Sequence, residues 1–105
     1  MRESTFERNL KKKLEIMFPG CFILKNNANL IQGIPDRLVL WHDKWAMLEV
    51  KRSADEAFQP NQEYYLSLFH EMSFAGCIYP ENEEEVLSAL QSAFTTPRQT
   101  RVSQR

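Results

Sequence analysis

The sequence predicts an α/β domain in which helices cover the faces of a mixed central sheet. Three stretches carry apolar residues at helical spacing, and short apolar runs bounded by Gly, Pro or Asn lie between them. The 105 residues are 43% hydrophobic and 26% charged, which is typical of one globular domain rather than a disordered chain. Such a short chain can bury only a small core.

The N-terminal part is predicted to hold one helix and one strand. Apolar residues three or four positions apart indicate an amphipathic helix over about residues 4–18, which Pro19-Gly20 ends. A short apolar run then predicts a strand at 21–25. The polar residues 26–29 form a connection that leads towards the centre of the chain.

The centre of the chain is predicted to form a β-hairpin. Apolar runs at 37–41 and 45–48 flank a short polar step, and Glu49-Val50-Lys51 closes the second strand. Because side chains alternate along a strand, Glu49 and Lys51 point to the same face. Antiparallel pairing brings Asp36, just before the first strand, beside the end of the second strand. We therefore expect these charged side chains to converge.

The C-terminal half is predicted to supply a helix, a strand and a last helix. The first of these helices is expected over about residues 60–73. The apolar strand at 75–79 has a composition that predicts a fairly central position in the sheet. The last helix spans 81–94, with acidic residues in its first turn, where the helix dipole favours them. Residues 1–96 then form one domain, followed by a flexible basic tail at 97–105.

The charged residues of the hairpin indicate a particular chemistry. Two nearby carboxylates, Asp36 and Glu49, repel each other, which raises one pKa or attracts a cation. Hard ions such as Mg²⁺ commonly take one or two protein carboxylates and keep water in their other positions. Lys51 beside such an ion could contact a phosphate. The alternative is structural, because Asp after Pro is common in turns and Glu-x-Lys can be a solvated ion pair.

A set of residues around the hairpin resembles the signature of the PD-(D/E)XK nucleases: Pro35, Asp36, Glu49, Val50 and Lys51. Gly33 and the segment 59–62 narrow this resemblance to the VRR-NUC branch and the related Holliday-junction resolvases. The resemblance covers about residues 5–80. It implies a restriction-endonuclease-like αβββαβα core. It also implies a Mg²⁺- or Mn²⁺-dependent endonuclease that hydrolyses the phosphodiester bonds of DNA, with selectivity for branched structures.

The resemblance assigns a role to each site residue. Asp36, Glu49 and the Val50 carbonyl would hold the ion. Lys51 would position or help to deprotonate water and steady the phosphate. Comparable nucleases place a glutamate on the first helix, facing the site, and Glu7 is the best match, as a ligand of a second ion or of water. The alternative for Glu7 is a helix cap or a solvated acid in the first helical turn.

Further roles are expected for an amide and for basic residues. Gln62, one turn inside its predicted helix, would pack against Lys51 or orient water, and the alternative is an exposed amide or a helix cap. Phosphate contacts would come from basic residues on the first helix and after the motif: Lys11, Lys12 and Arg52. The helix lysines can equally form an ordinary solvated face.

Net charge, cysteines and hydropathy limit the function classes. The net charge is −1, whereas a nucleic-acid-binding domain is often basic, so DNA binding would depend on local basic clusters and on a bound cation. Cys21 and Cys77 are expected to be free thiols, with a disulfide as the less favoured alternative. The chain lacks a run of about 18 apolar residues and a signal-peptide pattern, which predicts a cytoplasmic protein without a membrane partner.

The expected partners are DNA, branched or duplex, and a second copy of the chain. A resolvase cuts two strands symmetrically, and a two-fold homodimer provides the two sites. Two other functions stay open: a nicking or restriction-like nuclease without junction selectivity, and a non-catalytic nucleic-acid-binding protein with the same fold. Small stand-alone nucleases of this kind are frequent in phages and mobile elements, which makes a viral source plausible.

Overall fold

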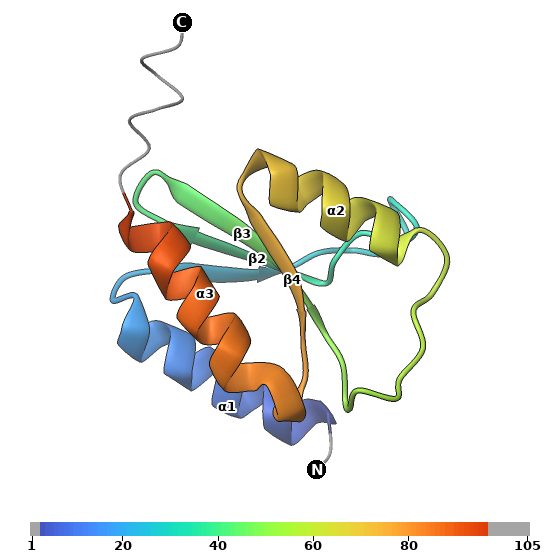
Figure 1. The fold of residues 1–105 in the computed structure, drawn as a ribbon, viewed down its shortest axis with the longest axis horizontal. Helices are drawn as coiled ribbons and strands as arrows, with labels where there is room; N and C mark the ends of the chain where they lie inside the picture. The colour runs from blue at the N-terminus through green and yellow to red at the C-terminus, as the bar shows by residue number, and fades with distance from the viewer. Residues whose placement is uncertain (1–2, 97–105) are drawn as a thin grey trace, which may run out of the picture.

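A four-stranded mixed sheet with three α-helices makes up the part of the chain that the computed structural model describes, residues 3–96 (Figure 1). The tail expected at 97–105 lies outside these residues. The elements are, in chain order, α1 (Glu3–Met17), β1 (Phe22–Lys25), β2 (Arg37–Trp41), β3 (Lys44–Val50), α2 (Gln62–Met72), β4 (Phe74–Ile78), the short 3-10 helix η1 (Pro80–Asn82) and α3 (Glu83–Thr95). This order of helices and strands is the predicted one.

The sheet has the strand order β1-β2-β3-β4. The first three strands are antiparallel neighbours, and β4 runs parallel to β3. The predicted hairpin is confirmed: Trp41 pairs with Lys44 across the turn, and Arg37 pairs with Leu48 near the other end. His42 in this turn has a φ of 57°, a left-handed conformation that favours tight hairpin connections.

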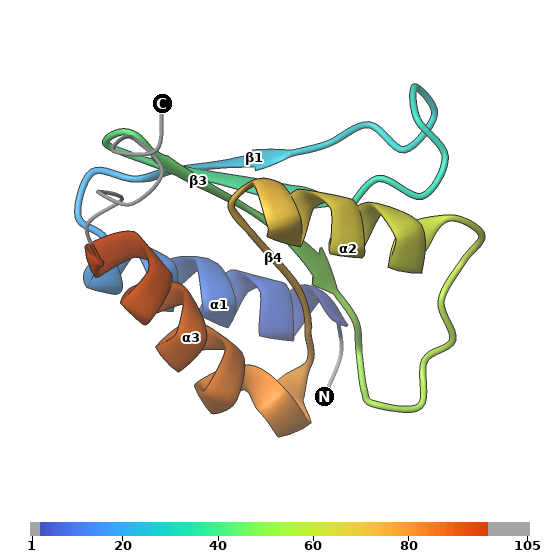
Figure 2. The same cartoon turned by 45° about the horizontal axis from the view of Figure 1, so that its top comes forward.

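The hydrophobic core lies on one face of the sheet. Helices α1 and α3 lie side by side against this face, and α2 lies apart from them near β4 (Figures 1 and 2). Apolar side chains of the strands alternate towards this core, as the period of a strand requires. The buried cluster consists of Phe6, Leu10, Leu14, Phe18, Val39, Ala46, Leu48, Val50, Phe74, Ile78, Leu87, Leu90 and Phe94.

Strand β4 corrects one prediction. The apolar composition of this segment predicts a fairly central strand, but β4 is at the edge of the sheet, with β3 as its neighbour. The strand is apolar because helices cover it: α2 and α3 both contact β4. Phe74 and Ile78 therefore belong to the core although no further strand pairs with β4 among residues 3–96.

Two further features concern the cysteines and the membrane. Cys21 and Cys77 are free and partly buried, as expected for structural thiols. Burial is also the main reason that the pKa of the Cys77 thiol rises to about 11, which keeps this thiol protonated. Within residues 3–96 no helix has both the length and the apolar character that a bilayer crossing requires.

Candidate active site

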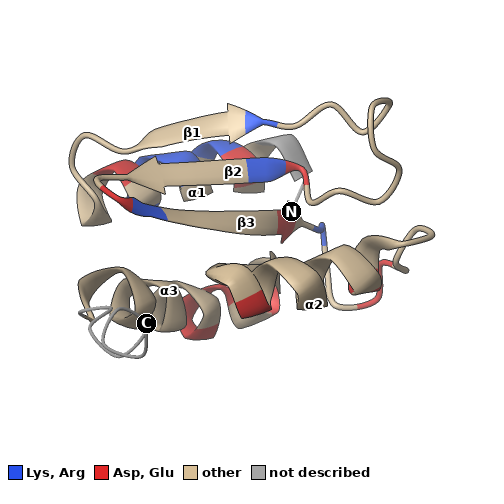
Figure 3. Cartoon of the chain, turned by 90° about the horizontal axis from the view of Figure 1, so that it is seen from above, with Lys and Arg blue, Asp and Glu red and all other residues tan. Residues whose placement is uncertain are grey.

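Two hydrogen bonds tie Asp36 to the end of β3, one to the Glu49 side chain and one from the Val50 backbone. The Asp36 backbone N–H donates to Glu49 Oε1 at 3.2 Å, and the Val50 backbone N–H donates to Asp36 Oδ1 at 3.1 Å. The hairpin register causes this arrangement, because the pair Arg37–Leu48 places Asp36 next to Glu49 just beyond the last paired residues. The predicted convergence of the two carboxyl groups is therefore confirmed. Figure 3 shows acidic and basic positions meeting at these ends of β2 and β3.

Lys51 is buried beside the two carboxyl groups. Its side chain is 3% exposed. The ammonium Nζ donates to Gln62 Oε1 at 3.0 Å and to the Ala57 carbonyl at 3.1 Å. Glu49 Oε2 lies 3.7 Å from the same nitrogen. Lys51 is therefore not part of a solvated Glu-x-Lys ion pair, which was the structural alternative. A buried charge is stable only when it is paired and hydrogen-bonded, and Lys51 meets both conditions.

Gln62 connects the lysine to the glutamate. Its Nε2 donates to Glu49 Oε2 at 2.9 Å while its Oε1 accepts from Lys51, so one amide fixes both charged groups. The Gln59 backbone N–H also donates to Gln62 Oε1, at 2.7 Å. The prediction that Gln62 packs against Lys51 is confirmed. Gln62 is, however, the first residue of α2 rather than one turn inside the helix, because the helix begins two residues later than predicted.

A close backbone contact holds the start of α2 against the loop before β2. Gly33 has a φ of +93°, and a Cβ built on it would lie 2.6 Å from both Asn61 Cβ and the Pro60 carbonyl oxygen. Asn61 itself has a left-handed φ of 72° at the helix N-cap. Only glycine combines this conformation with such close contact. The two segments that narrow the family resemblance, one at Gly33 and one at 59–62, therefore pack against each other.

The electrostatics of the site are dominated by Glu49. Burial, and then the neighbouring Asp36 carboxylate, raise the pKa of Glu49 to about 7, and the Lys51 charge opposes this shift. The carboxyl group therefore exchanges its proton close to neutral pH. A bound cation would favour the ionised form of both carboxyl groups and remove their repulsion.

Glu7 forms an ion pair with Arg37. The Arg37 guanidinium forms an ion pair with Glu7, donates to the Asp36 carbonyl at 3.2 Å and lies 3.7 Å from Asp36 Oδ2. Arg37 thus links helix α1 to the site. Neither alternative for Glu7, a cap or a solvated acid, describes this pairing. Its role as a metal or water ligand stays a prediction.

Comparison with protein-family models, with curated proteins and with solved structures gives no match. The resemblance to PD-(D/E)XK nucleases is therefore carried by the motif residues of this chain. What the structure adds is their arrangement, in which a carboxylate pair, a lysine and a glutamine from three segments meet.

The donor set of the site suits a hard divalent ion with water in most of its coordination positions. Among residues 3–96 no cluster of three or more His, Cys, Asp and Glu side chains is arranged to hold a metal, so neither a structural zinc site nor a calcium cage fits. The two carboxyl groups of Asp36 and Glu49 are the smaller oxygen set that Mg²⁺ commonly uses. These two carboxyl groups are the side chains that would hold the ion that the resemblance implies, and metal binding by them stays a prediction.

The basic residues predicted to contact DNA are exposed but lie on different parts of the fold. Lys11 and Lys12 are both exposed on α1, and Lys11 also lines a cavity between this helix and the sheet. Arg52, directly after Lys51, has a side chain that is 64% exposed, and Glu56 accepts its backbone N–H at 2.7 Å. Arg52 is adjacent to the site in sequence, whereas Lys11 lines the same cavity as Glu7.

Two residues of the site were not predicted from the sequence. Arg37 joins Glu7 to Asp36, and Glu56 Oε2 lies 4.0 Å from the Lys51 ammonium. A signal for Arg37 exists in the strand pattern. Arg37 is one position after Asp36, so its side chain points to the opposite face of the sheet. An amphipathic helix is expected to cover that face, and a cation buried there needs a carboxylate partner. Glu56 lies in an irregular loop, where no period indicates its direction.

Proposed function

We propose that this chain is a divalent-metal-dependent DNA endonuclease that hydrolyses phosphodiester bonds, with selectivity for branched DNA. The observation that carries the proposal is the buried Lys51 ammonium, held by Gln62 beside the neighbouring carboxyl groups of Asp36 and Glu49, each of which accepts a backbone N–H. A purely structural ion pair with Lys51 needs only one carboxylate, whereas here two carboxyl groups lie close enough to repel each other. The site would act inside the cell, in the cytoplasm, where its DNA substrate is found; a phage origin is part of the same proposal.

The residues have distinct roles in the proposed reaction. Asp36, Glu49 and the Val50 carbonyl would hold Mg²⁺ or Mn²⁺. When bound, the ion supplies Lewis acidity towards water and towards a phosphoryl oxygen. The Lys51 ammonium would position water and would stabilise, by its charge, the negative charge that grows on the phosphate in the transition state. Gln62 keeps the lysine and Glu49 in position, so that neither has to be reorganised during the reaction.

The proposed hydrolysis needs no covalent intermediate with the protein. A water oxygen forms a bond to phosphorus, and the bond from phosphorus to the leaving sugar oxygen breaks. One water proton ends on the leaving hydroxyl group, and the other passes to solvent as the new phosphomonoester ionises. No oxidant or further reactant is required, because water supplies both the nucleophile and the protons.

A cleavage panel tests the proposal. The native chain is incubated with a four-way junction, a flap, a linear duplex and a single strand, each in Mg²⁺, Mn²⁺ or EDTA. We expect cleavage of the junction with either metal and none in EDTA. The near-isosteric variants Asp36→Asn and Glu49→Gln should lose this cleavage while retaining the fold by circular dichroism.

The same panel separates the alternatives. Equal cleavage of junction and linear duplex would favour a nicking or restriction-like nuclease. Tight binding without cleavage in any metal would indicate a non-catalytic nucleic-acid-binding protein. Full activity of a folded Asp36→Asn variant would falsify the assigned site.

Metal binding can be measured apart from cleavage. A ligand that binds the folded chain stabilises it by an amount that grows with the logarithm of its concentration. Mg²⁺ should therefore raise the melting temperature of the native chain, and the rise should be absent in Asp36→Asn. Raising the ionic strength with NaCl to match the MgCl₂ solution controls for screening.

We further propose a homodimer that uses the sheet face opposite the main core. On this face β1 is open, with Phe22 66% and Leu24 46% exposed. The cross-strand partners Leu40 and Leu38 continue the apolar surface onto β2. Exposed contiguous apolar surface of this kind often marks an interface. A two-fold axis there would give a branched-DNA nuclease two sites.

A further inference from the structure

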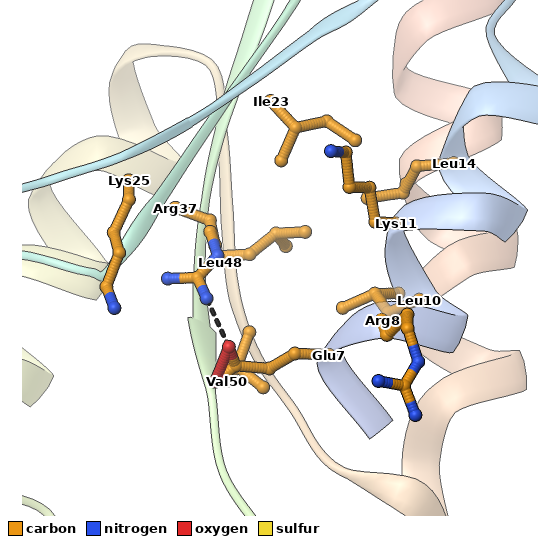
Figure 4. A pocket seen from close by; sticks show the side chains of 10 residues that line it. All are labelled: Glu7, Arg8, Leu10, Lys11, Leu14, Ile23, Lys25, Arg37, Leu48 and Val50. Atoms are coloured by element: carbon orange, nitrogen blue, oxygen red, sulfur yellow. Dashed lines mark hydrogen bonds and ion pairs between the residues drawn. The ribbon is translucent and has the colours of Figure 1, made fainter. Parts of the chain in front are cut away.

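A cavity of about 360 Å³ lies between α1 and the edge of the sheet formed by β1 and β2 (Figure 4). Side chains from the helix line one wall and side chains from the strands line the other. Its apolar lining residues are Leu10, Leu14, Ile23, Leu48 and Val50; Ile23 is partly exposed and the other four belong to the buried core. Its charged lining residues are Glu7, Arg8, Lys11, Lys25 and Arg37. The volume is near the lower end of the range for small-molecule sites, so one compact ligand would fill it.

The charges around this cavity are unbalanced. The Glu7 carboxylate is used by Arg37, which also contacts Asp36. Within residues 3–96 none of Arg8, Lys11 and Lys25 forms an ion pair. The remaining rim is therefore cationic and would favour an anion of more than one charge.

The sheet register places two of the cations face to face. Lys25 on β1 pairs directly with Arg37 on β2, so both side chains point to the cavity side of the sheet. Like charges directly opposite each other in a sheet are destabilising unless an anion lies between them. Glu7 supplies one such negative charge, and a bound phosphate would supply more.

We propose that this cavity binds a nucleoside monophosphate. The dianionic phosphate would lie at the rim against Lys11, Lys25 and Arg8, and the planar base would lie against Ile23 and the aliphatic stems of the lining lysines and arginines. The guanidinium of Arg8 is also suited to bidentate contact with phosphate oxygens. An internucleotide phosphate carries one charge, so the cationic rim fits a terminal phosphomonoester better. The ligand is either a free nucleotide or the phosphorylated end of a strand.

This binding site is independent of the proposed nuclease activity, because it needs neither a metal ion nor cleavage. The test is an NMR titration of the native chain in EDTA with thymidine 5′-monophosphate, thymidine and inorganic phosphate. We expect the monophosphate to bind at least about tenfold more tightly than either half alone, because each half contributes part of the binding energy. Amide shifts should centre on α1 and β1. If the native chain does not cleave DNA at all, the binding of the monophosphate should still be observed.

Matched variants test the assignment to the cavity. Lys11→Gln/Lys25→Gln removes two rim charges from exposed side chains and should weaken binding of the monophosphate about tenfold or more. Lys13→Gln/Lys44→Gln removes the same charge from residues outside the cavity and should keep the native affinity. Equal loss in both variants would show a general charge effect and overturn the proposal.

Other outcomes also decide the question. If inorganic phosphate binds as tightly as the monophosphate, the cavity holds an adventitious ion only. If the native chain shows no shifts at millimolar monophosphate, the site does not exist. Two duplexes with a one-nucleotide overhang, with and without a terminal phosphate, identify the source of the ligand. Tighter binding of the phosphorylated end than of the free monophosphate assigns the site to strand ends, and the reverse assigns it to free nucleotides.

Discussion

Lys51 carries its charge in a place where an unpaired ammonium group would be costly. Its three contacts, with Gln62, Ala57 and Glu49, leave the nitrogen oriented towards the carboxyl pair. A preorganised cation of this kind contributes most when negative charge develops in the transition state. The residue therefore allows chemistry to be separated from binding.

We expect Lys51→Met to slow the single-turnover cleavage of bound DNA by about a hundredfold or more, the scale for loss of one such electrostatic group. Methionine keeps most of the aliphatic length, so the buried side chain is replaced rather than removed. DNA affinity, measured in Ca²⁺ to prevent cleavage, should change much less because other phosphate contacts remain. Lys13→Met, far from the site, is the charge-matched control. A native cleavage rate in Lys51→Met would exclude the catalytic role of the lysine.

Glu49 makes stability depend on pH. The folded chain keeps the Glu49 proton up to about pH 7, whereas the unfolded chain releases it near the ordinary value of about 4.3. Between these pH values the folded state binds more protons than the unfolded state. The free energy of unfolding should therefore fall as the pH rises through this window, and the full cost is present above pH 7.

The variant Glu49→Gln should lack this dependence. Urea unfolding in EDTA at pH 5 and pH 8 measures it: relative to the native chain, the variant should be more stable at pH 8 than at pH 5. Glu63→Gln, on the exposed side of α2, is the control and should follow the native profile. Parallel profiles of the native chain and Glu49→Gln would contradict the raised pKa.

At the scale of elements, the contact between the Gly33 loop and the start of α2 decides whether Gln62 reaches Lys51. Gly33→Ala combines a positive φ with a methyl group that would lie 2.6 Å from the Pro60 carbonyl and from Asn61. We expect a loss of stability of about 2–4 kcal/mol, from conformational strain of about 1–3 kcal/mol together with the overlap. Cleavage should fall as well, because the helix must move away from the site.

Gly20 provides a matched control for this substitution. It has a similar φ of +86°, but no atom lies within 4 Å of an added Cβ. Gly20→Ala should therefore cost only the conformational strain, about 1 kcal/mol, and leave cleavage unchanged. Urea unfolding of the two variants isolates the steric contribution. Equal losses in both would show that the contact between the loop and α2 is not tight.

The elements illustrate what the sequence could predict. The hairpin follows from alternation, and its register alone brings Asp36 to Glu49. The partner of Glu7 did not follow, because the spacing of apolar residues indicates that α1 is amphipathic but not which face of the sheet it covers. The edge position of β4 was missed for a similar reason: burial by helices and burial between strands give the same apolar composition. The contact of Gly33 with Pro60 and Asn61 joins segments far apart in sequence, so no local sequence pattern predicts it.

At the scale of the whole molecule, the two faces of the sheet differ in how they are covered. One face is closed by α1 and α3, whereas α2 covers only the β3–β4 side of the other. The uncovered part carries the exposed Phe22 and Leu24 of β1. Apolar rows continue from them across β2, through Leu40 and Leu38, to Trp45 and Met47 on β3; Trp45 packs against Phe69 of α2, and Met47 is buried. Within residues 3–96 no strand pairs with the outer edge of β1, so a second copy could use both the face and the backbone of this strand.

We therefore expect the native chain of 12.4 kDa to sediment as a dimer at micromolar concentration. Leu24→Glu should give a folded monomer, because it places a charge in the centre of the apolar surface, where it would be buried without a partner. Ile16→Glu is the control: its side chain is 79% exposed on α1, away from this face, and the dimer should persist. If the proposed symmetric cutting depends on the dimer, Leu24→Glu should nick one strand of a four-way junction while the paired second cut is lost. A native chain that sediments as a monomer both alone and with junction DNA would remove the interface and leave a nicking enzyme.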